Sequence, residues 1–252
     1  MPPRVHLVRH AQGFHNLNVA NHTMHDPLLT PVGIEQCRTL AKDFPYTADV
    51  DLVVASPLKR TVYTALYSFP EPIEKKKLKV IAMPELQETS DLPCDTGSDP
   101  EEIAREFQGK PLDTSALATA EGKHWNDKKG RWAPHSDAIV ARAADARKWL
   151  LARPEKDIVV VTHGGFLHYF TEDWTGANKF AGSTGWANTE FRTYTFQSPS
   201  DPTLVETPES RERREGKEKP LSKEEQKNLQ RSATKQWEHA GYQKAKEIQA
   251  KV

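Results

Sequence analysis

The 252-residue chain is poor in cysteine and has no long apolar run and no excess of charge. Cys37 and Cys94 are its only cysteines, too few for a disulfide framework and without a paired metal motif. No stretch approaches the ~18 consecutive apolar residues that would span a membrane. The 35 Lys and Arg residues balance 35 Asp and Glu residues. This balance argues against nucleic-acid binding through a broad basic field.

The amino-terminal sequence is not typical of a targeting segment. Residues 1–4 lead directly into an apolar run that is too short for the core of a signal peptide. We therefore expect a cytoplasmic protein that has neither a membrane nor a nucleic acid as partner.

The low apolar content, 37% of the chain, is concentrated in its last part. Residues 201–252 contain 22 charged and 12 apolar residues, about 23% apolar, which leaves about 40% for residues 1–200. We expect residues 1–200 to form an ordinary globular domain and residues 201–252 a charged linker with a C-terminal helix. Charges alternate between Glu206 and Pro220 without an apolar period, which favours a solvated linker.

Beyond Pro220, apolar residues recur at helical spacing. They are Leu229, Ala233, Trp237, Ala240 and Ile248. The stripe predicts a helix that packs back onto the domain or onto a second copy of the chain as a homodimer. Docking of another protein is the alternative.

The first 200 residues alternate between strand-like and helix-like segments. Strands are expected at 4–8, 51–55, 79–82, 157–162 and 190–196. Helices are expected at 33–42, 56–68 and 136–151 and after 164, the second and third capped by Ser56 and Ser136. Residues 84–135 are irregular and far longer than a usual connection, so we expect an inserted lid. The alternation predicts an α/β fold, a three-layer α/β/α sandwich around a mostly parallel sheet.

Polar groups follow four of the expected strands. They belong to Arg9-His10, to Ser56–Arg60, to Glu85–Glu88 and to His163–Gly165. Because functional groups gather beyond the carboxyl ends of parallel strands, one pocket is expected there.

The sequence around these groups resembles the histidine phosphatase superfamily in its phosphoglycerate-mutase-like branch. The motifs are LVRHAQGFHN at 7–16, SPLKRTVYTA at 56–65, LQE at 86–88 and VTHGG at 161–165. The match covers roughly residues 4–200 in the right order. The resemblance implies phosphoryl transfer through a covalent phosphohistidine on a small phosphorylated metabolite, with no metal and no cofactor.

The resemblance assigns five roles by motif position. Arg9 and Arg60 would bind the phosphate oxygens with planar, permanently charged groups. His10 would attack phosphorus as a neutral imidazole, and His163, if protonated, would add positive charge to the phosphate site. Glu88 would protonate the leaving oxygen, which requires a raised pKa.

Further residues are expected around the phosphate. Gln12, Gly13 and Asn16 follow the nucleophile and are expected to line the pocket, with Asn16 as a hydrogen-bond donor, and Gly164 follows His163. His15 faces either the substrate or its own loop. A group of His22, His25 and Asp26 could suggest a metal cluster, although it has no fourth ligand and a solvated loop is favoured.

Three questions stay open at this level. The general acid could be Glu88 or a neighbouring carboxylate. The activity could be hydrolysis, phosphoglycerate-mutase-type transfer, or different chemistry in a repurposed pocket, although the Phe14-His15-Asn16 sequence is unlike that of the mutases. In the inserted segment, Phe107, Trp125 and Trp132 could contact an apolar or ring-containing substrate, or could simply pack the lid.

Overall fold

A computed structural model describes residues 1–177, 184–214 and 221–245, and it has an α/β fold around one seven-stranded sheet with strand order β4-β3-β2-β5-β1-β6-β7. The strands are β1 (Arg4–Arg9), β2 (Leu52–Ala55), β3 (Val80–Ala82), β4 (Leu112–Asp113), β5 (Asp157–Thr162), β6 (Phe191–Ser198) and β7 (Asp201–Glu206). Strands β1 to β5 run parallel to one another, whereas β6 pairs antiparallel with β1 on one side and with β7 on the other.

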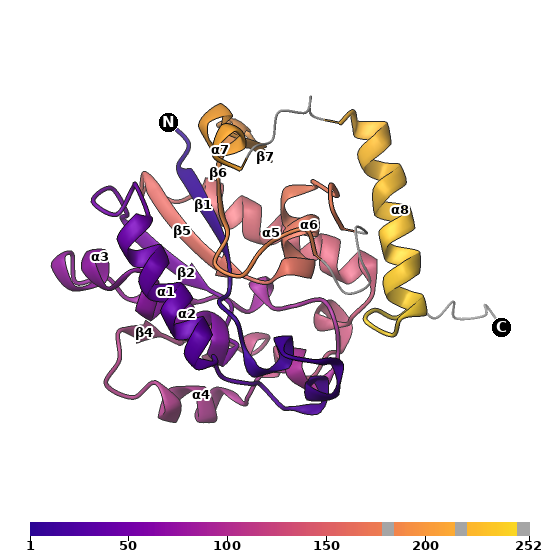
Figure 1. Cartoon of the computed structure of the whole chain (residues 1–252), viewed down its shortest axis with the longest axis horizontal. Coiled ribbons are helices and arrows are strands. Elements are labelled where there is room, and N and C mark those ends of the chain that lie inside the picture. Colours follow the sequence, from indigo (N-terminus) through magenta and orange to yellow (C-terminus); the bar gives the residue numbers. More distant parts are fainter. Residues whose placement is uncertain (178–183, 215–220, 246–252) are drawn as a thin grey trace.

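Helices cover both faces of this sheet (Figure 1). They are α1 (Pro31–Asp43), α2 (Lys59–Ser68), α3 (Pro70–Lys75), α4 (Pro100–Glu106), α5 (Ser136–Leu151), α6 (Gly164–Thr171), α7 (Pro208–Arg213) and α8 (Lys223–His239). In β5, Ile158 and Val160 pack with α5 and α6, while Val159 and Val161 pack with α1 and α2. A strand that is buried on both faces has an uninterrupted run of apolar residues in its sequence. The expected three-layer sandwich is confirmed.

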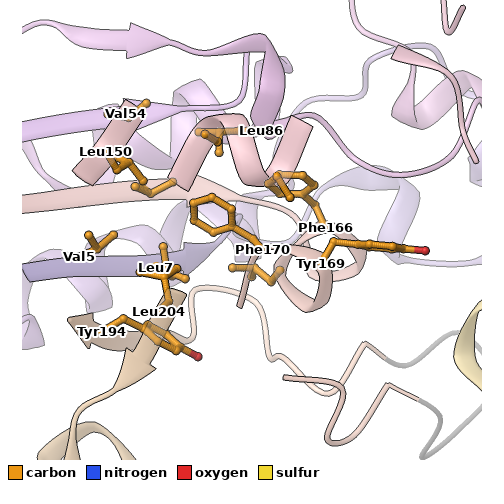
Figure 2. Close-up of a cluster of buried hydrophobic side chains, with 14 of the residues drawn as sticks. Val5, Leu7, Val54, Leu86, Leu150, Phe166, Tyr169, Phe170, Tyr194 and Leu204 are labelled. Atoms are coloured by element: carbon orange, nitrogen blue, oxygen red, sulfur yellow. The ribbon is translucent and has the colours of Figure 1, made fainter. Parts of the chain in front are cut away.

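The larger core cluster lies between the sheet and the α5–α6 layer. Figure 2 shows side chains from strands and helices meeting there, including Leu7 of β1, Leu150 of α5 and Phe170 of α6. This packing fixes β1, β5 and α6 relative to one another. The segments that follow β1 and β5 therefore leave the sheet at neighbouring positions.

Two helices begin differently from the expectation. Ser56 does not cap α2, because its hydroxyl pairs with the His163 ring, and the helix begins at Lys59 with Leu58 as N-cap. The Lys59 N–H instead donates to the carboxylate of Asp26, at 3.0 Å. In α5 the N-cap is His135, whose ring accepts from a backbone N–H.

The inserted segment, 84–135, is in large part core and not only a lid. Its strand β4 extends the sheet beside β3, and its aromatic residues join one buried cluster with residues of α2. These aromatic residues are Phe107, Trp125 and Trp132, which are 3%, 0% and 5% exposed. The hypothesis that they contact the substrate is therefore wrong. They pack the core, because large aromatic surfaces gain most from complete burial.

The segment expected to be a charged linker contains regular structure. Strand β7 pairs with β6, and Leu204 is buried in the larger core cluster. Helix α7 follows, with Thr207 as N-cap. The linker prediction overlooked that Glu206 is paired with Arg214, at 2.7 Å, so alternating charges can lie on a packed strand and helix.

Helix α8 confirms the predicted C-terminal helix, with Ser222 as its N-cap. Ala233 is fully buried in the larger core cluster, and Leu229 and Trp237 pack against it. Three members of the apolar stripe thus pack against the domain itself, whereas Ala240 is exposed and Ile248 lies outside the described residues. A homodimer, or docking through this helix, stays a prediction. No helix within the described ranges has the length and apolar composition needed to cross a bilayer.

We expect the Trp125→Ala variant to lower the free energy of unfolding by about 3–5 kcal/mol, because it leaves a large cavity in the core. The indole lies so close to Gly97 that a Cβ there would come within 1.9 Å of it. Denaturant unfolding measures the change. The control is Val140→Ala on α5, which is 43% exposed and should change stability by less than about 0.5 kcal/mol. Equal stability of wild type and Trp125→Ala would contradict this packing.

Candidate active site

His10 lies directly after β1, at the carboxyl edge of the sheet, and is 2% exposed. Its Nδ1 is 2.7 Å from the carbonyl oxygen of Ala11. Because a carbonyl can only accept, Nδ1 carries the proton and Nε2 keeps its lone pair. Burial, Arg60 and Arg9 lower the pKa of His10 well below its ordinary value. The ring is therefore a neutral imidazole with a free nitrogen, as a nucleophile requires.

Two guanidinium groups flank this ring. Arg9 is half-buried and donates to the carbonyl oxygen of Trp186. Arg60 is fully buried on α2 and donates to the carbonyl of Cys94 at 2.6 Å and to the carboxylate of Asp95 at 2.9 Å. Within the described residues, the Nε atoms of both arginines are buried without a hydrogen-bond partner, as are those of Arg142 and Arg147. The two permanent positive charges near one neutral imidazole favour an anion as the ligand.

His163 lies beside the nucleophile at the end of β5, with ring centroids 5.2 Å apart. Its Nδ1 is 3.1 Å from an Arg60 nitrogen, and its Nε2 is 2.8 Å from the Ser56 hydroxyl. Since a guanidinium can only donate, Nδ1 accepts and Nε2 carries the proton. Burial, with Arg60 next, lowers the pKa of His163 well below its ordinary value. The ring is thus neutral, and the positive charge of this site comes from the arginines.

Glu88 lies at the N-terminus of α6. Its carboxylate accepts from the backbone N–H groups of Gly165, at 3.1 Å, and Phe166, at 2.9 Å. Burial raises the pKa of Glu88, and the charge of Asp95 raises it further. Arg142 of α5 donates to the backbone carbonyl of Glu88, at 3.1 Å, and so fixes the main chain at this residue. A carboxyl group with a raised pKa can serve as a proton donor.

Asp95 is the main residue that the sequence did not single out. It lies in a short 3₁₀ helix, Pro93–Asp95, and accepts from Arg60 and from the Ser90 hydroxyl, at 2.5 Å. Through its effect on Glu88 it joins the arginine side of the site to the carboxylate side. The only available signal was its position directly after Cys94, seven residues beyond Glu88 in the sequence.

Of the four further residues expected around the phosphate, one borders the cavity and three do not. Asn16 borders the cavity, and its amide oxygen accepts from the Gly13 N–H at 3.0 Å, so its amide nitrogen is the group that could donate. Gln12, Gly13 and Gly164 do not border it. Gln12 binds Thr30 with its side chain, and Gly164 leaves space for Thr184, which a Cβ would meet at 2.3 Å. Gln12 and Gly13 thus belong to the loop after β1, and Gly164 begins α6 beside the site.

A cavity of about 560 Å³ borders His10. Its wall comes from residues 9–10, 15–22, 88–95, 165, 177, 184 and 236–242, including Arg9, His15, Glu88, Asp95 and Trp237. His15, whose position was left open, therefore faces the cavity, and its ring lies 5.4 Å from that of His10. Arg60 and His163 lie beneath this surface, fully buried.

The histidines of the 19–26 loop do not form a metal site. Asp26 is buried, 2% exposed, and its carboxylate accepts from the N–H groups of Lys59 and Ser98. The part of the chain that the structure describes contains no group of three or more His, Cys, Asp or Glu side chains that could hold a metal ion. The solvated-loop interpretation was wrong for Asp26, because its carboxylate joins two distant segments.

The site therefore combines a neutral histidine with two nearby guanidinium charges at the carboxyl edge of a parallel sheet, an arrangement suited to bringing an anion to a nucleophile. Residues 5–205 match the family model of the histidine phosphatase superfamily, branch 1. The chain therefore belongs to the histidine phosphatase superfamily. Relatives named phosphoglycerate mutase-like support the branch that its four motifs predicted.

Relatives in this superfamily are distant. A probable phosphatase of Schizosaccharomyces pombe is 28% identical over 168 residues, which cover 66% of this chain and 76% of that protein. Phosphoglycerate mutase-like protein 2 of Arabidopsis thaliana is 28% identical over an alignment of 267 positions, gaps included, which covers 81% of this chain and 78% of that protein. YhfR of Bacillus stearothermophilus is similar in fold, with a TM-score of 0.53 at 16% identity, over 81% of this chain and 95% of that one.

We expect the Asp95→Asn variant to lower the pKa of Glu88. Removing the negative charge of Asp95 makes ionisation of the Glu88 carboxyl easier, and it leaves Arg60 without its carboxylate partner. The NMR shift of the Glu88 carboxyl carbon, followed against pH, measures this pKa directly. The control is Glu101→Gln on α4, an exposed carboxylate. An unchanged or higher Glu88 pKa in Asp95→Asn would show that the two carboxylates do not interact.

Proposed function

We propose that this protein is a metal-independent phosphomonoester hydrolase that acts on a small phosphorylated metabolite through a phosphohistidine on His10. One observation carries the proposal: His10 is buried and neutral, its proton is on Nδ1, and the positive charges of Arg60 and Arg9 act on the ring. A phosphate monoester supplies both the negative charge that the two arginines favour and the electrophile that Nε2 can attack. The named relatives include a probable phosphatase, which supports the assignment.

In the first step, the Nε2 lone pair of His10 forms a bond to phosphorus while the bond to the alcohol oxygen breaks. Arg9 and Arg60 stabilise the charge on the non-bridging oxygens, and Asn16 can donate a further hydrogen bond. The departing oxygen takes the proton of Glu88. The products are phosphohistidine, the free alcohol and a Glu88 carboxylate.

In the second step, water attacks the phosphohistidine. The Glu88 carboxylate takes a proton from this water, and the bond between Nε2 and phosphorus breaks. Inorganic phosphate leaves, and both His10 and Glu88 return to their starting protonation states. Nδ1 keeps its proton and donates it to the Ala11 carbonyl throughout, which holds the ring in one orientation.

Mutase-type transfer is the alternative, and the cavity gives it less support. A phosphoglycerate carries a carboxylate beside its phosphate, and binding it calls for a second cation. Among the described residues, Arg9 is the one Lys or Arg that borders the cavity, and we assign it to the phosphate together with the buried Arg60. We therefore favour hydrolysis over mutase-type transfer.

We expect the His10→Ala variant to lose turnover of 4-nitrophenyl phosphate by roughly 10⁴-fold or more, because the nucleophile is removed. Circular dichroism should show that it folds like the wild type. The matched control is His124→Ala, which removes an exposed histidine and should leave turnover unchanged. Wild-type turnover that persists in His10→Ala would exclude the phosphohistidine mechanism.

We expect the Glu88→Gln variant to lose kcat/KM for alkyl phosphates by roughly 10²–10⁴-fold, and much less for 4-nitrophenyl phosphate. Alkoxides need a proton to leave, whereas nitrophenolate does not. The ratio kcat/KM reports the first chemical step and so isolates the acid role from the later use of Glu88 as a base. Equal losses on the two substrates would assign the proton to another group.

A further inference from the structure

The C-terminal segment forms one wall of the cavity over His10. Gln236, Trp237, Ala240 and Tyr242 border it, facing Asn18, Val19 and His22 of the loop after β1. The rings of Tyr242 and His22 lie 6.1 Å apart. Figure 1 shows α8 lying along one side of the molecule. A segment with the composition of a solvated extension thus reaches the site of the chemistry.

This wall is attached to the domain at both of its ends. At its start, the Gln226 side chain accepts from the Trp174 N–H, at 2.8 Å. In the middle, Trp237 packs on Trp174 with ring centroids 5.7 Å apart. At its end, Gln243 accepts from the Tyr169 hydroxyl, at 2.9 Å. These contacts position the aromatic side chains of the wall relative to the catalytic residues.

The next residue, Lys244, adds two contacts. Its backbone N–H donates to the Pro134 carbonyl at 2.8 Å, and its ammonium pairs with Asp91, which lies three residues beyond Glu88. The C-terminal segment is therefore tied to the same stretch of chain that carries the carboxylates of the site.

The chemistry of the wall differs from that of the cavity floor. The floor holds Arg9, His10 and Glu88, whereas the C-terminal side offers an indole, a phenol, an amide and a methyl group. Trp237 is half-buried, with its inner part against the core, and Tyr242 belongs to none of the core clusters. Val19 and Leu92 add apolar surface from the domain. Aromatic side chains of this kind bind flat apolar bodies.

We propose that Trp237 and Tyr242 bind the alcohol part of the substrate and select phosphate monoesters of uncharged, ring-containing alcohols. This inference rests on the proposed function, because it places the phosphate at Arg9 and His10. A volume of about 560 Å³ accommodates a phosphate together with one or two rings. The aromatic selection that the sequence suggested for the inserted segment is thereby assigned to the C-terminal segment.

The test compares 2-phenylethyl phosphate with ethyl phosphate, which have similar alkoxide leaving groups and differ in the ring. Wild type should have the higher kcat/KM for 2-phenylethyl phosphate. In Tyr242→Ala, the ratio of the two kcat/KM values should fall about tenfold, or about 1.4 kcal/mol, mainly through KM. Trp237→Leu should lower the ratio in the same direction. The control is Lys235→Ala, an exposed residue of α8, which should keep the wild-type ratio.

The outcomes separate this inference from the proposed function. A wild type that hydrolyses both substrates, with a ratio that Tyr242→Ala does not change, would overturn the aromatic wall and leave the hydrolase intact. Hydrolysis that persists in His10→Ala would overturn the proposed function itself. Thermal unfolding of each variant shows whether a lower kcat/KM arises from loss of folding. Tyr242→Ala is expected to have the wild-type Tm, because Tyr242 belongs to none of the core clusters.

Discussion

The protonation state of one buried imidazole is the constraint on which the site depends. In the proposed reaction, His10 has to stay neutral and keep the lone pair of Nε2 available beside a dianionic group. Burial and two neighbouring guanidinium groups keep it neutral, and the Ala11 carbonyl decides which nitrogen holds the proton. The arginines that we propose as phosphate ligands therefore also keep the proposed nucleophile neutral. A single electrostatic arrangement serves binding and reactivity.

The fold provides this arrangement through packing. Strands β1 and β5 pair in parallel register, from Arg4 with Asp157 to Arg9 with Thr162, so His10 and His163 follow at the same edge. Glu88 is fixed by the N-terminus of α6 and by Arg142. Asp95 pairs with Arg60, and its negative charge acts on Glu88. The residues that we propose as proton donor, nucleophile and phosphate ligand thus interact within one buried site.

The sequence predicted well what depends on local pattern and on motif order. The alternation of apolar segments predicted the three-layer sandwich, and the ends of the strands predicted where Arg9, His10, Arg60, Glu88 and His163 come together. It failed where a residue's partner is distant in the chain. Asp26 and Asp95 lie in segments whose sequence is typical of loops, yet the carboxylate of each binds residues that are distant in the chain. The sequence also could not show whether Trp125 and Trp132 line a cavity or fill a core, because aromatic residues occur in both places.

The most direct test of this account is to trap the covalent intermediate. During turnover of a radiolabelled phosphomonoester, the enzyme should be denatured rapidly and the bound label followed in alkali and in acid. The account predicts label on His10 that survives alkali and is lost in acid, as phosphohistidine is, and that is absent from His10→Ala. Label that survives acid and is lost in alkali would contradict it, because the phosphoryl group would then reside on another side chain.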